Sequence, residues 1–326
     1  MSVILAAPDR YEAVRKTMRY LRAQTARDRL EIVIVAPTAR DLDIDAAERE
    51  AFLQFRVVEV GVIKSPAQAY AAGTRGASAP VVALAEEHSY PEPGWAEALI
   101  EAHRQPWAAV GPVIVNANPR TALSWAHVLL GFASWLEPTA AGVVGHLPGH
   151  NASYKRGLLL EYGPQLEAML AVEILLHWDL RARGYELYLE PGAKTSHVQV
   201  THLPSWIAVQ FLSARLFAST RALNGRWSAF RRLLFTCGAP IIPSTSPLWR
   251  LRGIVQEVRR PGRPHDLLPR ALPALLFGLA LAGAGQVVGY AFGAGDAIER
   301  MADFEFHRDR HVTERDRQAL ARDDPS

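Results

Sequence analysis

The sequence predicts an α/β protein with a mostly parallel, Rossmann-like sheet flanked by helices, followed by a helical C-terminal region. Through the first 200 residues, short runs rich in β-branched residues alternate with runs whose apolar residues recur at helical spacing. This order is typical of a parallel sheet covered by helices on both faces. Near the C-terminus, residues 271–293 carry no charge, which predicts a membrane-associated helix.

The expected elements alternate in βαβα order. In residues 11–24, Val14, Met18 and Leu21 lie on one face of a predicted helix. The other helices are predicted over 65–77 and 95–105. Strands are predicted over 2–7, 31–36, 55–60, 80–85 and 107–115. Ligands of such sheets bind beyond the carboxyl ends of the strands, so we expect the functional residues there.

Composition excludes several classes of protein. The 326 residues have a net charge of +3, but arginine is concentrated between residues 226 and 270, which favours a local basic patch over general nucleic-acid binding. Cys237 is the only cysteine, so a disulfide framework and a cysteine metal site are excluded. The apolar run at 2–7 is too short for a signal peptide, and the charged residues Asp9 and Arg10 interrupt it. We therefore expect no export.

Four regions are predicted along the chain. Residues 1–200 form the α/β domain, 201–270 an amphipathic and basic helical region, 271–293 the apolar membrane segment, and 294–326 a charged tail that is frayed or bound to the surface. Within the second region, Arg215 and Arg221 lie among aromatic residues of an amphipathic helix. Residues 233–249 are uncharged, but three prolines disfavour a plain membrane helix there.

The segment 271–293 is long enough to cross about 30 Å of hydrocarbon at 1.5 Å per residue. Gly285, Gly289 and Gly293 recur at intervals of four, which permits close helix packing. The segment could span, re-enter as a hairpin with residues 233–249, or lie in the interface plane. A buried helix of a soluble domain, or a helix packed on a partner chain, is the competing interpretation. The basic flank is expected on the cytoplasmic side, where its arginines face anionic headgroups or an acceptor phosphate, or only set topology.

Over roughly residues 2–200 the chain resembles the family 2 glycosyltransferases, which have the GT-A fold. The matching stretches are "VILAAPDRYEAVRKTMRYLRAQT", "ALAEEHSYPEPGW", "LPGHNASYKRGLLLEYG" and "VEILLHWDLRARGYELYLEPGAKTSHV". The order and spacing of the four stretches are more specific than any one of them.

The resemblance implies a divalent metal site after the fourth strand. The family's Asp-x-Asp pair falls on Glu86 and His88, and His197 matches a histidine that often completes the site. Such a site holds Mn²⁺ or Mg²⁺ on the donor's diphosphate, and an imidazole favours Mn²⁺. Glu87 is expected to point away if the backbone is extended. A solvated acidic turn, or direct donation by His88 to phosphate without a metal, are the alternatives.

The family's catalytic acid pair falls on Val172 and Glu173, so only the second acid is kept. The resemblance implies that Glu173 is the base that takes the proton of the acceptor hydroxyl during an inverting transfer. On a helix, Glu173 shares a face with His177, which could orient it. A surface or capping glutamate is the alternative, although its neighbours are apolar.

The remaining site residues are assigned by the same resemblance. Pro8, Asp9 and Glu87 are expected at the donor, and His150, Asn151, Tyr154 and Lys155 at the acceptor. Three positions of the donor pocket also depart from the family. Ala36 replaces the aspartate that reads uracil, Ala71 replaces an asparagine, and Asp9 stands where the first loop usually has an asparagine. The base of the donor nucleotide therefore stays open.

Together these features predict a glycosyltransferase at the cytoplasmic face of the cell membrane, acting in the biosynthesis of an envelope glycan. Its partners are a nucleotide-sugar donor, a lipid or lipid-linked glycan acceptor and the membrane, and nucleic acid is not among them. The alternative is a catalytically silent GT-A domain that serves as a membrane-bound scaffold. The lost residues at 36 and 172 favour that alternative.

Overall fold

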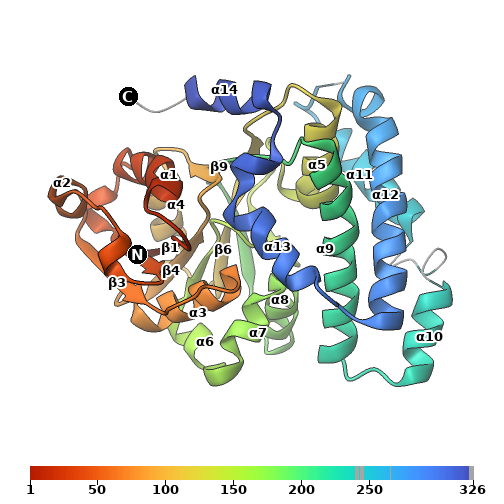
Figure 1. Ribbon diagram of the computed structural model, residues 1–326, viewed down its shortest axis with the longest axis horizontal. Coiled ribbons are helices and arrows are strands. Elements are labelled where there is room, and N and C mark those ends of the chain that lie inside the picture. Colours follow the sequence, from red (N-terminus) through yellow and green to blue (C-terminus); the bar gives the residue numbers. More distant parts are fainter. Residues whose placement is uncertain (239–241, 243–245, 265, 323–326) are drawn as a thin grey trace. The chain divides into compact units, whose positions relative to one another are not determined.

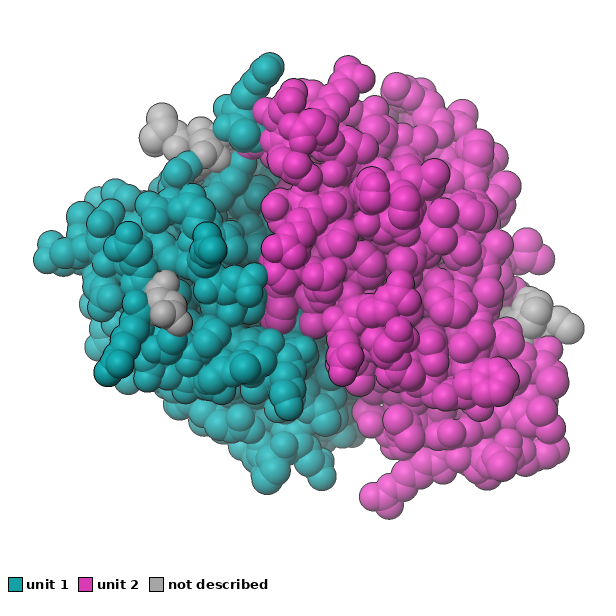
Figure 2. Space-filling model, in the orientation of Figure 1, with its two compact units in different colours: residues 1–115, 139–197, 321–326 teal, residues 116–138, 198–320 magenta. Residues whose placement is uncertain are grey.

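The computed structural model describes residues 1–238, 242, 246–264 and 266–322. It divides into two compact units, coloured separately in Figure 2. Unit 1 comprises residues 1–115, 139–197 and 321–326, and unit 2 comprises 116–138 and 198–320. Unit 2 thus contains most residues beyond 198 and also residues 116–138, which come from the middle of the predicted α/β domain.

Unit 1 is built on a sheet with the strand order β3-β2-β1-β4-β8-β6-β9-β5, and β7 also pairs with β9. β3, β2, β1 and β4 are parallel, β8 runs antiparallel to β4 and β6, and β5 and β7 run antiparallel to β9. The strands are β1 Ser2–Ala6, β2 Glu31–Ala36, β3 Gln54–Glu59, β4 Val81–Ala85, β5 Ser89–Pro91, β6 Ala109–Asn116, β7 Gly142–Val144, β8 Ser153–Lys155 and β9 Leu187–His197.

The five predicted strands are confirmed as β1, β2, β3, β4 and β6. β1 and β2 are buried along their whole length, which is why they read as unbroken apolar runs. The sequence did not reveal β5, β7 and β8, because a strand of three residues is too short to show a period. Two of these short strands, β5 and β8, flank the candidate site.

Helices pack on the sheet of unit 1 (Figure 1). α1 buries Val14, Met18 and Leu21, as its spacing predicts, and α3 packs on β1, β2 and β3. The three predicted helices are confirmed as α1, α3 and α4. The helices of this unit are α1 Glu12–Arg22, α2 Ala46–Glu50, α3 Pro66–Gly76, α4 Trp95–Ala102, α6 Arg156–Leu160, α7 Leu166–Leu170 and α8 Glu173–Ala182.

Unit 2 is helical and is centred on α12 (Leu267–Phe292), which packs along α9 (Leu203–Asn224) and α5 (Ala122–Phe132). A Cβ at Gly285 or Gly289 would overlap the backbone of α9, so these glycines permit the close approach predicted from their spacing. α12 ends where Gly293 takes a φ of +80°. α12 is long and apolar enough to cross a membrane, and 39% of its most apolar window is buried within the protein.

Two shorter helices, α10 (Ala229–Gly238) and α11 (Pro247–Val258), occupy both ends of the uncharged segment 233–249. Residues 239–241 and 243–245 lie outside the described residues, so the hairpin considered for this segment is not tested. Several arginines of the basic region serve the packing of unit 2. Arg263 donates to the carbonyl oxygens of Ala133 and Leu136, and Arg215 donates to that of Gly293.

Most of the C-terminal region forms helices, so of the two states expected for the tail, frayed or bound to the surface, residues 297–322 are not frayed. α13 (Ala297–Phe306) and α14 (Glu314–Arg322) form, and α13 packs on α9. Asp316 is buried and its carboxylate accepts hydrogen bonds from the hydroxyls of Thr201 and Thr313, at 2.6 and 2.9 Å. These polar contacts could not be read from the charged composition of the tail.

Candidate active site

The candidate site of unit 1 begins where β4 ends. Residues 86–88 form a turn between β4 and β5. The hydroxyl of Thr17 on α1 donates to the carbonyl oxygens of Glu86 and Glu87, at 3.2 and 3.0 Å, and fixes this turn. The carboxylates of the turn therefore stand at the carboxyl end of a parallel strand, where ligands of such sheets bind.

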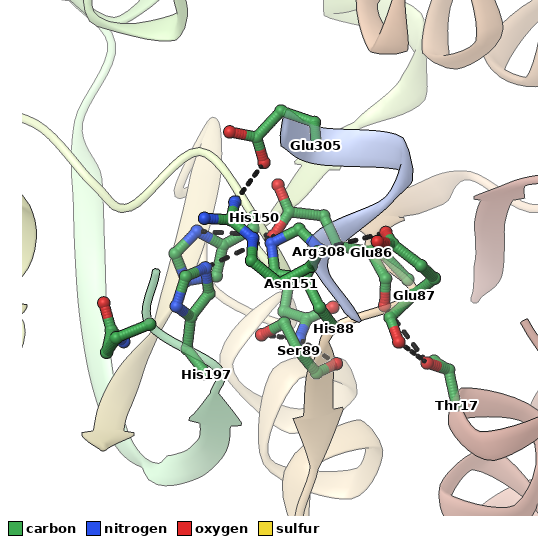
Figure 3. Close-up of polar contacts among 12 residues, drawn as sticks. Thr17, Glu86, Glu87, His88, Ser89, His150, Asn151, His197, Glu305 and Arg308 are labelled. Atoms are coloured by element: carbon green, nitrogen blue, oxygen red, sulfur yellow. Dashed lines mark hydrogen bonds and ion pairs between the residues drawn. The ribbon is translucent and has the colours of Figure 1, made fainter. Parts of the chain in front are cut away.

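Three imidazoles gather around one carboxylate oxygen, Glu86 Oε2 (Figure 3). His88 Nε2 lies 3.3 Å from this oxygen, His197 Nε2 3.7 Å and His150 Nδ1 3.8 Å. The three rings are buried, each at most 5% exposed, and the Glu86 side chain is 16% exposed. The ring of His197 stands between the other two, edge-on to His88 and tilted against His150.

Strand pairing explains how residues so far apart in the sequence meet. β5 pairs antiparallel with β9, and the register places Ser89 opposite His197. His88 precedes Ser89 directly, so it stands beside His197. The pairing of β4 with β8 brings in the loop before β8, because the Asn151 N–H donates to the Leu84 carbonyl oxygen at 2.6 Å. His150 is the preceding residue of that loop.

Asn151 anchors the loop that carries His150. It has a φ of +51°, a conformation that asparagine tolerates better than most residues. Its side-chain amide donates to the carbonyl oxygen and the hydroxyl of Ser89, at 3.0 and 2.8 Å. Its main-chain carbonyl oxygen accepts from the Trp95 indole. Asn151 is fully buried. Its predicted contact with an acceptor is therefore replaced by a structural role.

The residues present fit a divalent metal ion. Ligand atoms of Glu86, His150 and His197 all lie within 4.8 Å of one another. One carboxylate with two imidazoles suits Mn²⁺, Fe²⁺, Co²⁺ or Zn²⁺, whereas Mg²⁺ prefers oxygen ligands. His150 enters this set although the sequence placed it at the acceptor. His88 instead bridges two carboxylates, since its Nδ1 lies 2.9 Å from Glu87 Oε2. The turn thus directs Glu87 toward His88, and the expectation that it points away was wrong.

Glu173 lies next to the same loop. It is the first residue of α8, and a Cβ at Gly149 would stand 2.6 Å from its carboxyl carbon. The glycine at position 149 therefore leaves the space that this carboxylate occupies, and a larger residue there would displace the carboxylate. The proximity of Glu173 to this loop could not be predicted from the sequence. The glycine directly before His150 is its only local trace.

The expected pairing of Glu173 with His177 does not form through the imidazole nitrogens. His177 Nδ1 accepts from the Leu147 N–H at 3.4 Å, and Nε2 lies 2.9 Å from the Tyr154 hydroxyl. Burial, with a smaller contribution from His146, lowers the pKa of His177 to about 3, so its ring is neutral. Burial and the nearby Glu173 carboxylate raise the pKa of Tyr154. The neutral ring and the protonated phenol match as a hydrogen-bonded pair.

The structure does not support acceptor roles for Tyr154 and Lys155. Tyr154 is 1% exposed and its hydroxyl is directed to His177. The Lys155 ammonium donates to the carbonyl oxygens of His103 and Gln105, at 3.3 and 3.2 Å. Both residues belong to β8, whose pairing with β4 and β6 fixes them. The polar cluster "NASYK" thus reads as a site in the sequence but supplies hydrogen bonds to the core.

Pro8 and Asp9 come after β1 at the same edge of the sheet as the turn 86–88. β1 and β4 are parallel neighbours, and Leu5 pairs with Ala85 at their carboxyl ends. The loop that carries Pro8 and Asp9 and the turn that carries Glu86 therefore leave adjacent strands on the same side. Their donor-binding roles remain predictions.

Residues 2–163 match the model of glycosyl transferase family 2. This part of the chain is a family 2 glycosyltransferase domain. The match contains the turn 86–88 and His150 and ends before Glu173 and His197. The roles of all these residues remain predictions. The GT-A fold implied by the resemblance, an α/β fold with a mostly parallel sheet flanked by helices, is confirmed for unit 1. No curated protein sequence matches the chain.

Several solved structures are similar to the glycosyltransferase chain at low identity. A mannosyltransferase from Pyrobaculum calidifontis, in complex with GDP-Man and Mn²⁺, is 17% identical with a TM-score of 0.48, over 90% of this chain and 86% of the other. TarS residues 1–349 of S. aureus, in complex with UDP, are 15% identical with a TM-score of 0.45, over 90% of each chain. GalNAc-T7 with UDP, GalNAc and Mn²⁺ is 11% identical with a TM-score of 0.46, over 84% and 57%.

Proposed function

We propose that the protein transfers a sugar, with inversion, from a nucleotide-sugar donor to a lipid or lipid-linked glycan acceptor at the cytoplasmic face of a membrane. The observation that carries the proposal is the convergence of Glu86, His150 and His197 at the carboxyl end of β4, with the Glu173 carboxylate against Gly149 of the same loop. A possible cation-binding group and a carboxylate that could act as base thus both lie next to the loop of residues 149 and 150, which supports the proposal.

Glu86, His150 and His197 would hold a divalent ion, which when bound neutralises the charge of the departing nucleoside diphosphate. His88 holds Glu86 and Glu87 together and so keeps the metal-facing carboxylate in place. Glu173 would accept the proton of the acceptor hydroxyl as its oxygen attacks the anomeric carbon from the face opposite the diphosphate. A glutamate reaches one methylene further than the aspartate typical of the family.

The membrane part of the proposal is supported by α12 and by the basic region before it. An enzyme held at a lipid surface meets amphiphilic acceptors at high effective concentration. The segments of a membrane protein that are rich in lysine and arginine usually lie on the cytoplasmic side. The arginines between residues 226 and 270 therefore favour that side.

The test is hydrolysis or transfer from a panel of nucleotide sugars, with and without Mn²⁺. Glu173→Gln removes the base without changing the shape of the side chain, so turnover should fall by about 10²–10⁴-fold while donor binding is kept. Donor binding is read separately from the rise in melting temperature with ligand. Binding without turnover in the unsubstituted protein, under every donor and metal, would favour the silent scaffold. Full turnover in Glu173→Gln would contradict the assignment of the base.

A further inference from the structure

An apolar stripe runs along the exposed face of α10 in unit 2. Phe230, Leu233, Leu234 and Cys237 have the spacing i, i+3, i+4, i+7, which places them on one side of the helix. The first three are 76%, 60% and 52% exposed, and Cys237 is also exposed. Leucine and phenylalanine on a helix normally face a core, so this face of α10 is one that a partner is expected to cover.

The opposite face of α10 is held firmly. Phe235 packs against Trp227 and Tyr290, and the Arg231 guanidinium lies 4.3 Å from the centre of the Trp227 ring. Tyr290 belongs to α12 and is fully buried in a cluster with Ala218 and Ala222 of α9. The stripe is therefore displayed by a packed helix rather than by a loose segment.

More apolar side chains are exposed elsewhere in unit 2. Leu223 and Phe292, the ends of α9 and α12, are 61% and 80% exposed. On α11, Leu248 and Trp249 are 73% and 53% exposed, and the Arg252 guanidinium lies 5.7 Å from the Trp249 ring centre. Aromatic and basic side chains side by side are typical of helices that lie at a membrane interface.

The charge around the stripe selects the partner. Between residues 221 and 264 the sequence contains nine arginines and one acidic residue, Glu257. Glu257 pairs with Arg260 at 2.8 Å and with Arg263 at 3.8 Å. Arg263 is buried, but Arg226, Arg252, Arg259 and Arg260 of unit 2 are exposed. Exposed leucine and phenylalanine together with exposed arginines complement anionic headgroups above hydrocarbon.

A second copy of the chain fits this surface poorly. Residues 221–256 contain no carboxylate, so a two-fold interface through this region would offer no acidic partner to the exposed Arg226 of either copy. α12 itself contacts α9 along its glycines, which makes it the central helix of unit 2. The stripe residues Phe230, Leu233 and Leu234 are more exposed than Leu276 and Phe277 of α12, which are 49% and 48% exposed.

We infer that α10 is an interfacial anchor: its stripe of Phe230, Leu233, Leu234 and Cys237 lies in the acyl–headgroup boundary of an anionic lipid surface. The inference rests on the membrane association proposed above and assigns it to α10 and its arginines. Buried apolar area then supplies the adhesion, and the arginines select acidic lipids.

The test is flotation of the full-length protein with vesicles of phosphatidylcholine alone or mixed with phosphatidylglycerol. Co-flotation is expected with the mixed vesicles and should weaken in high salt. The double variant Leu233→Asp/Leu234→Asp should bind at least roughly tenfold more weakly, because two leucines no longer enter the lipid. The matched control is Leu53→Asp/Val62→Asp, which alters two exposed apolar residues of unit 1 (65% and 75% exposed) and should float like the unsubstituted protein.

Three outcomes would overturn the inference. Undiminished flotation of the α10 variant would mean that another segment, such as α12, holds the membrane. Equal binding to neutral vesicles would remove the role of the arginines. A dimer in solution that the α10 substitutions dissociate would make a second copy the partner. Donor hydrolysis, measured without vesicles, should be the same in the α10 variant and the unsubstituted protein, so a failure of anchoring is separable from a failure of the proposed function.

Discussion

Unit 1 contains two groups of buried histidines that differ in their partners. His88, His150 and His197 surround a carboxylate at the end of β4, whereas His103 and His177 contact the hydroxyls of Ser153 and Tyr154, each at 2.9 Å. Burial lowers the pKa of His103 to about 4, with a further effect of Lys155, and that of His177 to about 3. Burial alone therefore does not distinguish the candidate-site histidines from the core histidines. The two groups differ in that the candidate-site rings share one carboxylate, Glu86, at a strand end.

The largest expected effect concerns the hydroxyl-bonded group. The pKa of each ring is lower in the folded state than its value of 6.5 in the unfolded chain, so the unfolded chain takes up protons first as the pH falls. The stability they provide is present above pH 6.5 and is lost toward pH 4. Between pH 7 and pH 5 each should cost about 2 kcal/mol of the unfolding free energy.

Urea unfolding at both pH values measures this loss. His103→Gln should reduce it by about 2 kcal/mol, because one titrating ring is removed. An unchanged loss in this variant would show that other groups, and not the core histidines, set the acid sensitivity.

The next effect tests the carboxylate-centred group. Even the loss of an outer-shell partner of a metal typically costs 10- to 100-fold in affinity, and Glu86 is proposed as a direct ligand. Glu86→Ala should therefore lower Mn²⁺ affinity by about 100-fold or more. Isothermal titration calorimetry gives the affinity directly. Glu101→Ala, which removes an exposed carboxylate on α4, is the matched control and should bind Mn²⁺ normally. Equal affinity in both variants would disprove the metal assignment.

Tyr154→Phe should affect stability without affecting the metal. It leaves the buried His177 Nε2 without its hydroxyl partner, which costs about 1–3 kcal/mol. Thermal or chemical unfolding measures the cost, and Mn²⁺ titration should match that of the unsubstituted protein. A large drop in metal affinity would mean that the two histidine groups are coupled.

The smallest effect is expected at Gly149, which directly precedes His150 and lies next to Glu173. In Gly149→Ala the new methyl group displaces the Glu173 carboxylate, and turnover should fall about tenfold through misplacement of the base. Gly157→Ala is the control, since a Cβ there meets nothing within 4 Å. If turnover is kept in Gly149→Ala while Glu173→Gln loses it, the carboxylate tolerates movement, and the close approach is only a matter of packing.

The sequence predicted the parallel strands because they are unbroken apolar runs, and the helices over them because their apolar residues recur at helical spacing. It located Glu86, His88 and His197 through a family pattern, and strand pairing brings these three together. It could not separate His150 from Tyr154 and Lys155, because all belong to one polar stretch. Their different roles arise from β8, a strand of three residues whose pairing with β4 and β6 has no local signal. The buried partners of the tail, such as Thr201 for Asp316, lie more than a hundred residues away and were likewise invisible.

The assignment of α5 to unit 2 has a consequence for synthesis on the ribosome. α5 is an apolar helix that packs on α12, and Leu130 would meet a Cβ at Gly278. About 135 residues separate the end of α5 from the start of α12, so at about 5–20 residues per second α5 emerges roughly 7–30 s before its partner exists. During that interval the nascent chain exposes an apolar helix that lacks its packing partner. Such a helix is prone to aggregate and is the kind of segment that chaperones bind.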